Sequence, residues 1–134
     1  MSKLNVVAGI LLKNNKILLP KRSISLKYSP NKYEFPGGKV ENGETLKDAL
    51  KRELYEELSI DVNTSNIIDF PNNILETDKI LLTLFVINSW SNNLKLNPEI
   101  NSEILEVEIN ELENVEDLLE TDKELIPAIV KFLK

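Results

Sequence analysis

Runs of apolar residues, separated by short polar stretches, divide the chain into segments whose lengths fit strands and helices. Apolar runs rich in β-branched residues predict strands, and the run at residues 103–109 also alternates in part between apolar and polar positions. These strands are expected at residues 4–12, 17–19, 67–70, 79–90 and 103–109. Asn14-Asn15 separates the first two, and because Asn tolerates positive φ, the pair predicts a hairpin turn. Pro71-Asn72-Asn73 is expected to end the third strand.

Leucines spaced four apart predict a helix over residues 45–58. Thr45 is the expected N-cap, and Asp48 follows three residues later, an arrangement similar to a capping box. A second helix is expected over residues 124–132, where Pro127 is tolerable because it lies in the first turn. Strands on both sides of a central helix, with a terminal helix, predict an α/β protein whose sheet packs between helices.

The composition excludes several kinds of chemistry. The chain has 134 residues, which favours one domain over residues 1–134, and it contains neither cysteine nor histidine. Disulfides, thiolate or imidazole metal sites, and serine–histidine or cysteine–histidine catalysis are therefore excluded. Any metal ion must be a hard cation held by oxygen atoms.

Charge and hydropathy limit the partners that this chain can have. The net charge is -6, and affinity for DNA or RNA rests on clustered Lys and Arg, so no nucleic acid polymer is expected as a partner. The apolar stretch at residues 80–87 is too short to cross a membrane. We therefore expect a cytoplasmic protein without membrane contact, either a monomer or a homodimer.

One face of the central helix carries three glutamates, Glu53, Glu56 and Glu57, at spacing i, i+3, i+4. Like charges on one face repel each other, and a divalent cation would compensate them. The alternative is a solvated surface patch. At about 100° per residue, however, the glutamates lie beside the leucine row, at the edge of the buried surface where a cleft can form. The opposite face holds Asp48, Arg52 and Tyr55.

The loop before this helix concentrates glycine. Gly37, Gly38 and Gly43 are three of the four glycines in the chain, and Lys39 adds a positive charge. Glycine permits tight turns and close approach of the backbone to a ligand. An ordinary strand-to-helix connection is the alternative interpretation of the glycines alone.

Together the loop and the helix resemble the motif of the Nudix family, which is Gly, five residues, Glu, seven residues, then Arg-Glu-apolar-any-Glu-Glu-any-Gly-apolar. The residues that fit at the required spacing are Gly38, Glu44, Arg52, Glu53, Leu54, Glu56, Glu57 and Ile60. Ser59 departs from the motif, because the family usually has glycine there. Glycine after a helix often adopts the left-handed conformation, so serine is expected to cost roughly 1 kcal/mol of stability and to leave the chemistry intact.

The resemblance extends to the MutT-type branch, which hydrolyses oxidised purine nucleoside triphosphates. The Val-Ala-Gly-Ile entry strand, the Lys21-Arg22 pair and the segment at residues 34–39 are similar to that branch. The resemblance implies an α/β/α sandwich around a mixed β-sheet. It also implies Mg²⁺, or Mn²⁺, bound by Glu53, Glu56 and Glu57 together with the backbone carbonyl of Gly38.

The resemblance also implies roles for single residues. Glu53 would be the general base, Arg52 would orient Glu53, Glu44 would contribute near the site, and Lys39 would assist near the phosphates. A later glutamate reaches the site in MutT-type enzymes. Glu99 and Glu103 are the candidates for it here, with solvated side chains as the alternative.

For the nucleotide, the resemblance places Arg22 and Phe35 near the substrate, although Phe35 could equally be core packing. Alignment on Pro127 puts Leu125 where MutT-type enzymes use Asn or Asp to read the purine edge. Asp122 and Glu124 lie nearby but out of register. Recognition of guanine through a side chain is therefore expected to be weak unless Asp122 or Glu124 supplies it.

The leading hypothesis is a nucleoside triphosphate pyrophosphohydrolase that sanitises damaged purine nucleotides such as 8-oxo-dGTP, releasing monophosphate and pyrophosphate. One alternative is a Nudix hydrolase of another small nucleotide, either a pyrimidine triphosphate or a nucleotide sugar. The other is a binding module that keeps the fold without catalysis. The complete set of acidic residues speaks against the binding module, because a non-catalytic copy has no physical need for clustered like charges.

Overall fold

The computed structural model describes residues 3–69 and 74–133, which form strands and helices in mixed order. The strands are β1 (Leu4–Lys13), β2 (Lys16–Arg22), β3 (Gly37–Lys39), β4 (Ile74–Glu76), β5 (Ile80–Ile87) and β6 (Asn101–Glu108). The α-helices are α1 (Leu46–Leu58), α2 (Glu120–Lys123) and α3 (Ile126–Leu133). Two short 3-10 helices are η1 (Thr64–Asn66) and η2 (Ile109–Asn114).

The described strands form a six-stranded mixed sheet in the order β4-β5-β1-β2-β6, with β3 paired to β1. β1 and β5 run parallel, whereas β1 pairs antiparallel with β2 and β3. Asn14 and Asn15 have φ values of 53° and 62°, which is the left-handed conformation that a two-residue hairpin turn requires. The predicted hairpin and the mixed sheet are both confirmed.

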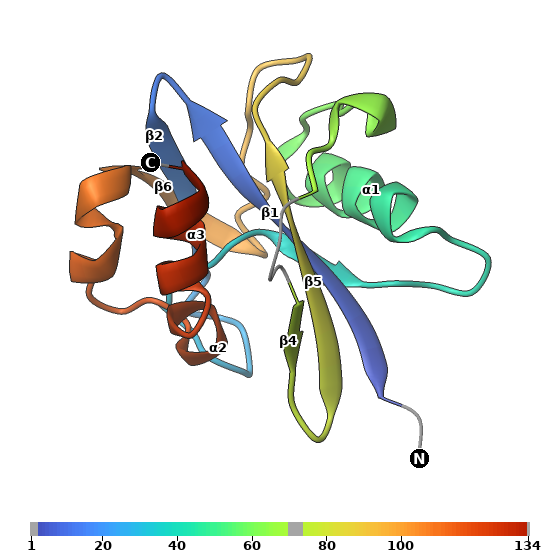
Figure 1. Ribbon diagram of the computed structural model, residues 1–134, viewed down its shortest axis with the longest axis horizontal. Coiled ribbons are helices and arrows are strands. Elements are labelled where there is room, and N and C mark those ends of the chain that lie inside the picture. The colour runs from blue at the N-terminus through green and yellow to red at the C-terminus, as the bar shows by residue number, and fades with distance from the viewer. Residues whose placement is uncertain (1–2, 70–73, 134) are drawn as a thin grey trace.

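Helices cover both faces of the sheet, as Figure 1 shows with α1 on one side and α2 and α3 on the other. Alternate side chains of β1 explain this arrangement. Val7 and Leu11 pack in the cluster that contains the buried leucines of α1. Ala8 and Ile10 pack in the opposite cluster, with residues of η2 and α3. The predicted α/β/α sandwich is therefore confirmed.

Helix α1 begins where the sequence predicts, because the Thr45 hydroxyl accepts a hydrogen bond from the Asp48 amide at 3.1 Å. The C-terminal helix begins at Ile126 rather than at residue 124, and Pro127 lies in its first turn, as expected. The short helix α2, which precedes it, was not predicted.

The predicted strands differ from the observed ones mainly at their ends. The strand expected at 79–90 is β5 and spans Ile80–Ile87. The strand expected at 103–109 is β6 and begins earlier, at Asn101. In the segment expected at 67–70, Ile68 bridges to Val86, while residue 70 and the predicted end at 71–73 lie outside the described residues. In the part of the chain that the structure describes, no helix is long and apolar enough to cross a membrane.

Candidate active site

Two glycines of β3 bring the backbone against helix α1. Gly37 and Gly38 pair with Ala8 and Val7 of β1. A Cβ atom on Gly37 would overlap the carbonyl oxygen of Val7, and one on Gly38 would come within 2.5 to 2.7 Å of the Glu53 carboxylate. Position 37 therefore needs glycine, because backbone atoms block a side chain there, whereas Gly38 lets the strand lie directly beside the Glu53 carboxylate.

Arg52 is the centre of the charged network on α1. Its guanidinium donates to both oxygens of Glu44, at 2.7 and 2.9 Å, and to the carbonyl oxygen of Lys39 at 2.9 Å. It also donates to Glu53 at 2.9 Å and to Glu56 at 3.3 Å. A bidentate pair fixes the plane of the guanidinium, so Arg52 holds Glu53 in a defined orientation.

The Glu44 carboxylate is itself fixed from two sides. The hydrogen bonds from Arg52, together with one from the Glu41 amide at 2.9 Å, lower the pKa of Glu44 to about 2. Glu44 is therefore ionised at neutral pH and holds Arg52 in place. The helix periodicity predicts that Arg52 lies on the face opposite the leucine row. The structure shows that its long side chain reaches from there to the loop and to Glu53.

Glu57 is a buried carboxyl group without full compensation. Its residue is 8% exposed, and one of its side-chain oxygens, Oε2, has no hydrogen-bond partner. Burial, with smaller contributions from Glu34 and Glu53, raises the pKa of Glu57 to about 9. Burial also raises the pKa of Glu53, against the opposing effect of Arg52.

These carboxyl groups have the chemistry that a divalent cation requires. A hard cation would give the unpartnered oxygen of Glu57 a ligand and would neutralise the repulsion among the glutamates. Within residues 3–69 and 74–133, no three acidic side chains already converge around one point. Glu53 and Glu56 each give one oxygen to Arg52, which leaves the other oxygen of each carboxylate for an ion.

A second buried polar cluster, which contains Glu34 and Asn101, was missed by sequence analysis. Glu34 is 8% exposed and accepts a hydrogen bond from Arg22 at 3.1 Å. Asn101 is fully buried, and its amide group donates to the Lys21 carbonyl at 3.2 Å and to Glu34 at 3.4 Å. Burial raises the pKa of Glu34. The charge of Glu34 directly before the apolar pair Phe35-Pro36 was a local signal in the sequence, whereas no local pattern marks Asn101.

Asp122 lies in the same buried region as Phe35. Its carboxylate accepts a hydrogen bond from the Phe35 amide at 2.9 Å, and the residue is 3% exposed. Burial raises the pKa of Asp122 to about 7, and Glu34 adds to the shift. Leu125 packs in the hydrophobic core, as does the Phe35 side chain. The structure thus brings together Asp122 and Phe35, two of the three residues predicted near the nucleotide.

Arg22, the third residue predicted near the nucleotide, forms hydrogen bonds within the protein. Besides Glu34, its guanidinium donates to the carbonyl oxygens of Tyr28 at 3.0 Å and Ser29 at 3.2 Å. These bonds tie the loop after β2 to the buried cluster. Arg22 therefore holds this loop at the edge of the buried polar region.

The two later glutamates occupy different positions. Glu103 lies on β6 and pairs with Lys21 at 3.6 Å. Glu99 lies in the preceding loop, where the Asn97 amide donates to the Glu57 carbonyl at 3.2 Å. That hydrogen bond ties the Glu99 loop to the end of α1. Both glutamates and the Lys39 side chain are exposed.

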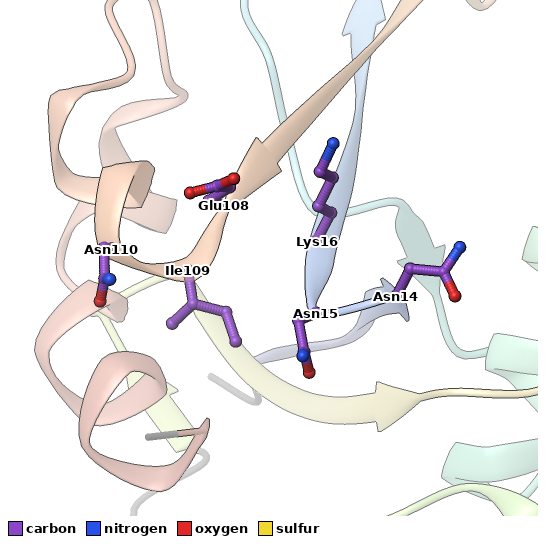
Figure 2. Close-up of a pocket in the computed structure, with 6 residues that line it drawn as sticks. All are labelled: Asn14, Asn15, Lys16, Glu108, Ile109 and Asn110. Carbon is purple, nitrogen blue, oxygen red and sulfur yellow. The ribbon is translucent and has the colours of Figure 1, made fainter.

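A pocket of about 420 Å³ lies elsewhere, at the turn between β1 and β2 (Figure 2). Its lining residues are Asn14, Asn15, Lys16, Glu108, Ile109 and Asn110. The turn is at the far end of β1 from Val7 and Ala8, which pair with the two glycines of β3. This pocket therefore has no part in the glutamate site.

Comparison with known proteins agrees with this geometry. The NUDIX domain family matches residues 3–130. The 8-oxo-dGTP diphosphatase of Proteus vulgaris is 36% identical over 93 residues, which cover 69% of this chain and 82% of that protein. The 8-oxo-dGTP diphosphatase of Escherichia coli strain K12 is 46% identical over 61 residues, 45% of this chain and 46% of that protein, so the match spans about half of that relative.

A solved structure extends the similarity to nearly the whole chain. The solution structure of the E. coli ORF135 protein superimposes with a TM-score of 0.81 at 27% identity. The superposition covers 98% of this chain and 91% of that one. The family match, the arrangement of the sheet and the position of Glu53 beside Gly38 all agree, and the chain therefore belongs to the NUDIX domain family as a Nudix hydrolase of the MutT type.

Proposed function

We propose that this Nudix hydrolase cleaves 8-oxo-dGTP, and related purine nucleoside triphosphates, to monophosphate and pyrophosphate, and so removes oxidised nucleotides from the free pool. The observation that carries the proposal is the glutamate array on α1, in which Arg52 orients Glu53 and the buried Glu57 has a side-chain oxygen without a hydrogen-bond partner. The relatives named 8-oxo-dGTP diphosphatase support this substrate.

As a Nudix hydrolase, the protein depends on a divalent metal ion. We propose Mg²⁺, with Mn²⁺ as a substitute, held by Glu53, Glu56 and Glu57 and by the carbonyl of Gly38. Such an ion neutralises phosphate charge and lowers the pKa of a bound water. The unpartnered oxygen of Glu57 supports this ligand set, because a buried carboxylate without a partner is costly unless a cation compensates it.

The remaining tasks fall to groups that hold or move a proton. Glu53 would accept the proton of the attacking water, since it is a partly buried carboxylate that Arg52 holds in a defined orientation. Arg52 fixes Glu53, and Glu44 fixes Arg52. Lys39 supplies positive charge to the phosphates, and Glu99 is the later glutamate that completes the site.

Base recognition depends on Asp122 in this proposal. Its pKa of about 7 means that near neutral pH the carboxyl group is present both as a hydrogen-bond acceptor and as a donor. Leu125 cannot form such bonds and lies in the core. One carboxyl oxygen of Asp122 is already used by the Phe35 amide. We therefore expect only modest selectivity for 8-oxo-dGTP over dGTP.

The test is a substrate panel measured with and without metal. Steady-state kcat/KM is compared for 8-oxo-dGTP, dGTP, dCTP and ADP-ribose in Mg²⁺, in Mn²⁺ and in excess chelator, with the products identified. The expected result is a preference for the guanine nucleotides, release of pyrophosphate, and no turnover in chelator. Preference for dCTP or ADP-ribose would overturn the substrate, and absence of turnover with every nucleotide would favour a binding module.

Four expectations from the sequence stay predictions. They are the single domain over residues 1–134, the monomeric or homodimeric state, the cytoplasmic location and the absence of a nucleic acid polymer as partner. Size-exclusion chromatography with light scattering measures the oligomeric state directly.

A further inference from the structure

The turn between β3 and α1 contains an asparagine followed by glycine. Of the four glycines in the chain, only Gly43 follows an asparagine, Asn42. Both residues are exposed, and the Glu44 amide closes the turn by donating to the Glu41 carbonyl at 3.1 Å. This turn connects the glycine strand with the helix that carries the glutamates.

The surroundings of Gly43 leave its backbone nitrogen free to react. Gly43 has a φ of 86°, and apart from its two chain neighbours nothing lies within 4 Å of the position that a Cβ atom would occupy. Within the described residues its amide donates to no backbone acceptor. An unhindered, unpaired amide next to an asparagine side chain is the arrangement in which cyclisation of asparagine meets least steric resistance.

We propose that Asn42 is a site of spontaneous deamidation, and that the isoaspartate formed there disables the glutamate array. The backbone nitrogen of Gly43 bonds to Cγ of Asn42 while the bond from Cγ to Nδ2 breaks, and the amide group leaves as ammonia with the Gly43 proton. Water then opens the cyclic imide at one of its two carbonyls. One opening gives aspartate, and the other gives isoaspartate, whose side-chain carbon has become part of the main chain.

The consequence for the site follows from the hydrogen bonds of the turn. The Glu41 amide donates to the Glu44 side chain at 2.9 Å, while the Glu44 amide donates to the Glu41 carbonyl. Both bonds need the present spacing between residues 41 and 44. An additional main-chain carbon at residue 42 changes that spacing and displaces the Glu44 carboxylate from Arg52.

Loss of the Glu44 contact would reach Glu53 through Arg52. Glu44 supplies two of the hydrogen bonds that fix the guanidinium, and Arg52 in turn holds Glu53 at 2.9 Å. Misplacement of a catalytic group by about 1 Å can cost up to about 10²-fold in rate, so we expect roughly a tenfold or greater loss of turnover in the isoaspartyl protein. This activity effect rests on the proposed function, whereas the modification itself does not.

The modification is measured directly by peptide mass spectrometry. Full-length protein is aged in mildly alkaline buffer, and samples are taken over days for trypsin digestion. Cleavage after Lys39 and Lys47 yields the peptide at residues 40–47, which contains Asn42 as its only asparagine. The amide-to-acid mass change and enzymatic methylation of isoaspartate report the two products, and turnover of 8-oxo-dGTP is measured on the same samples.

Two variants separate the backbone change from the charge. Asn42→Gln keeps a neutral amide that cyclises far more slowly, and it should retain both its mass and its activity. Asn42→Asp adds the charge without lengthening the main chain, and because residue 42 is exposed, its activity before ageing should stay within about twofold of the wild type. Wild-type activity should fall in proportion to the isoaspartate found at residue 42.

Each other outcome contradicts part of the proposal. An unmodified peptide from aged protein, when a synthetic peptide of the same sequence deamidates under the same conditions, would overturn the modification site. Isoaspartate formation without loss of turnover, or equal loss of turnover in Asn42→Gln, would overturn its effect on the glutamate array. If no nucleotide is hydrolysed at all, the proposed function fails while the peptide measurement still decides the modification.

Discussion

Ser59 occupies the position after α1 where the family motif has glycine, and the structure gives a reason to change it back. Its φ and ψ are 62° and 14°, the left-handed conformation, and its amide donates to the Tyr55 carbonyl at 3.0 Å. The left-handed conformation costs a residue with a Cβ atom roughly 1–2 kcal/mol. Glycine adopts it freely, but glycine also has greater freedom in the unfolded chain, which offsets about 0.4–1 kcal/mol.

The difference predicts that Ser59→Gly raises the free energy of unfolding by about 0.5–1 kcal/mol. For a chain of this length that corresponds to a rise in Tm of roughly 2–4 °C. Urea denaturation gives the free energy, and a midpoint shift without a change of slope shows that stability itself has changed. Turnover should be nearly unchanged, because residue 59 lies outside the network around Arg52.

Ser59→Ala is the matched control. It removes the hydroxyl group but keeps the Cβ atom and therefore the left-handed strain, so it should give no gain. The reasoning is refuted if Ser59→Ala stabilises as much as Ser59→Gly, or if Ser59→Gly gives no gain. A large rise in turnover of Ser59→Gly would show that the departure from the motif is functional.

Four further predictions concern the site. Glu53→Gln should lower turnover by about 10²-fold or more with folding retained. The control Asp48→Asn, an exposed change on the same helix, should leave turnover unchanged. A near-normal kcat of Glu53→Gln would show that Glu53 is not the base. Gly38→Ala should lower kcat by up to about 10²-fold, because its Cβ would displace the Glu53 carboxylate. Stability should change little, since that carboxylate is flexible. Steady-state kinetics measure the first effect, and calorimetry measures the second. The pKa of Glu57 is about 9 in the folded protein, compared with an ordinary value of 4.5 in the unfolded chain. Between these two pH values the folded state holds a proton that the unfolded state has lost. The free energy of unfolding of metal-free protein should therefore fall as pH rises from about 5 to 9. Denaturation across that range with and without Mg²⁺ tests this, since the ion should reduce the fall. Asp122→Leu should lower the free energy of unfolding by about 1–3 kcal/mol, because it leaves the Phe35 amide unpaired, and should weaken binding of guanine nucleotides. Asp122→Asn should keep the stability of the wild type. Equal Tm values for the two variants would contradict this reasoning.

Local patterns in the sequence determined the elements that depend on neighbouring residues. The leucine row and the Thr45 cap determine α1, because helix periodicity and capping involve residues three or four apart. Asn14-Asn15 determines the hairpin for a similar reason, since the turn needs positive φ at two adjacent residues. The spacing of the three glutamates likewise put them on one face of α1, because residues three and four apart share a helix face.

Only the tertiary structure decided which distant residues meet. Arg52 lies on the helix face away from the leucine row, and the length and flexibility of its side chain allow it to reach the loop and Glu53. Asn101 joins Glu34 because β6 pairs with β2, a contact between segments about eighty residues apart. Asp122, out of register in the linear alignment, reaches the Phe35 amide because the unpredicted helix α2 carries it there. Periodicity assigns a side chain to a face, but strand pairing and side-chain reach, which involve residues far apart in the chain, decide what it contacts.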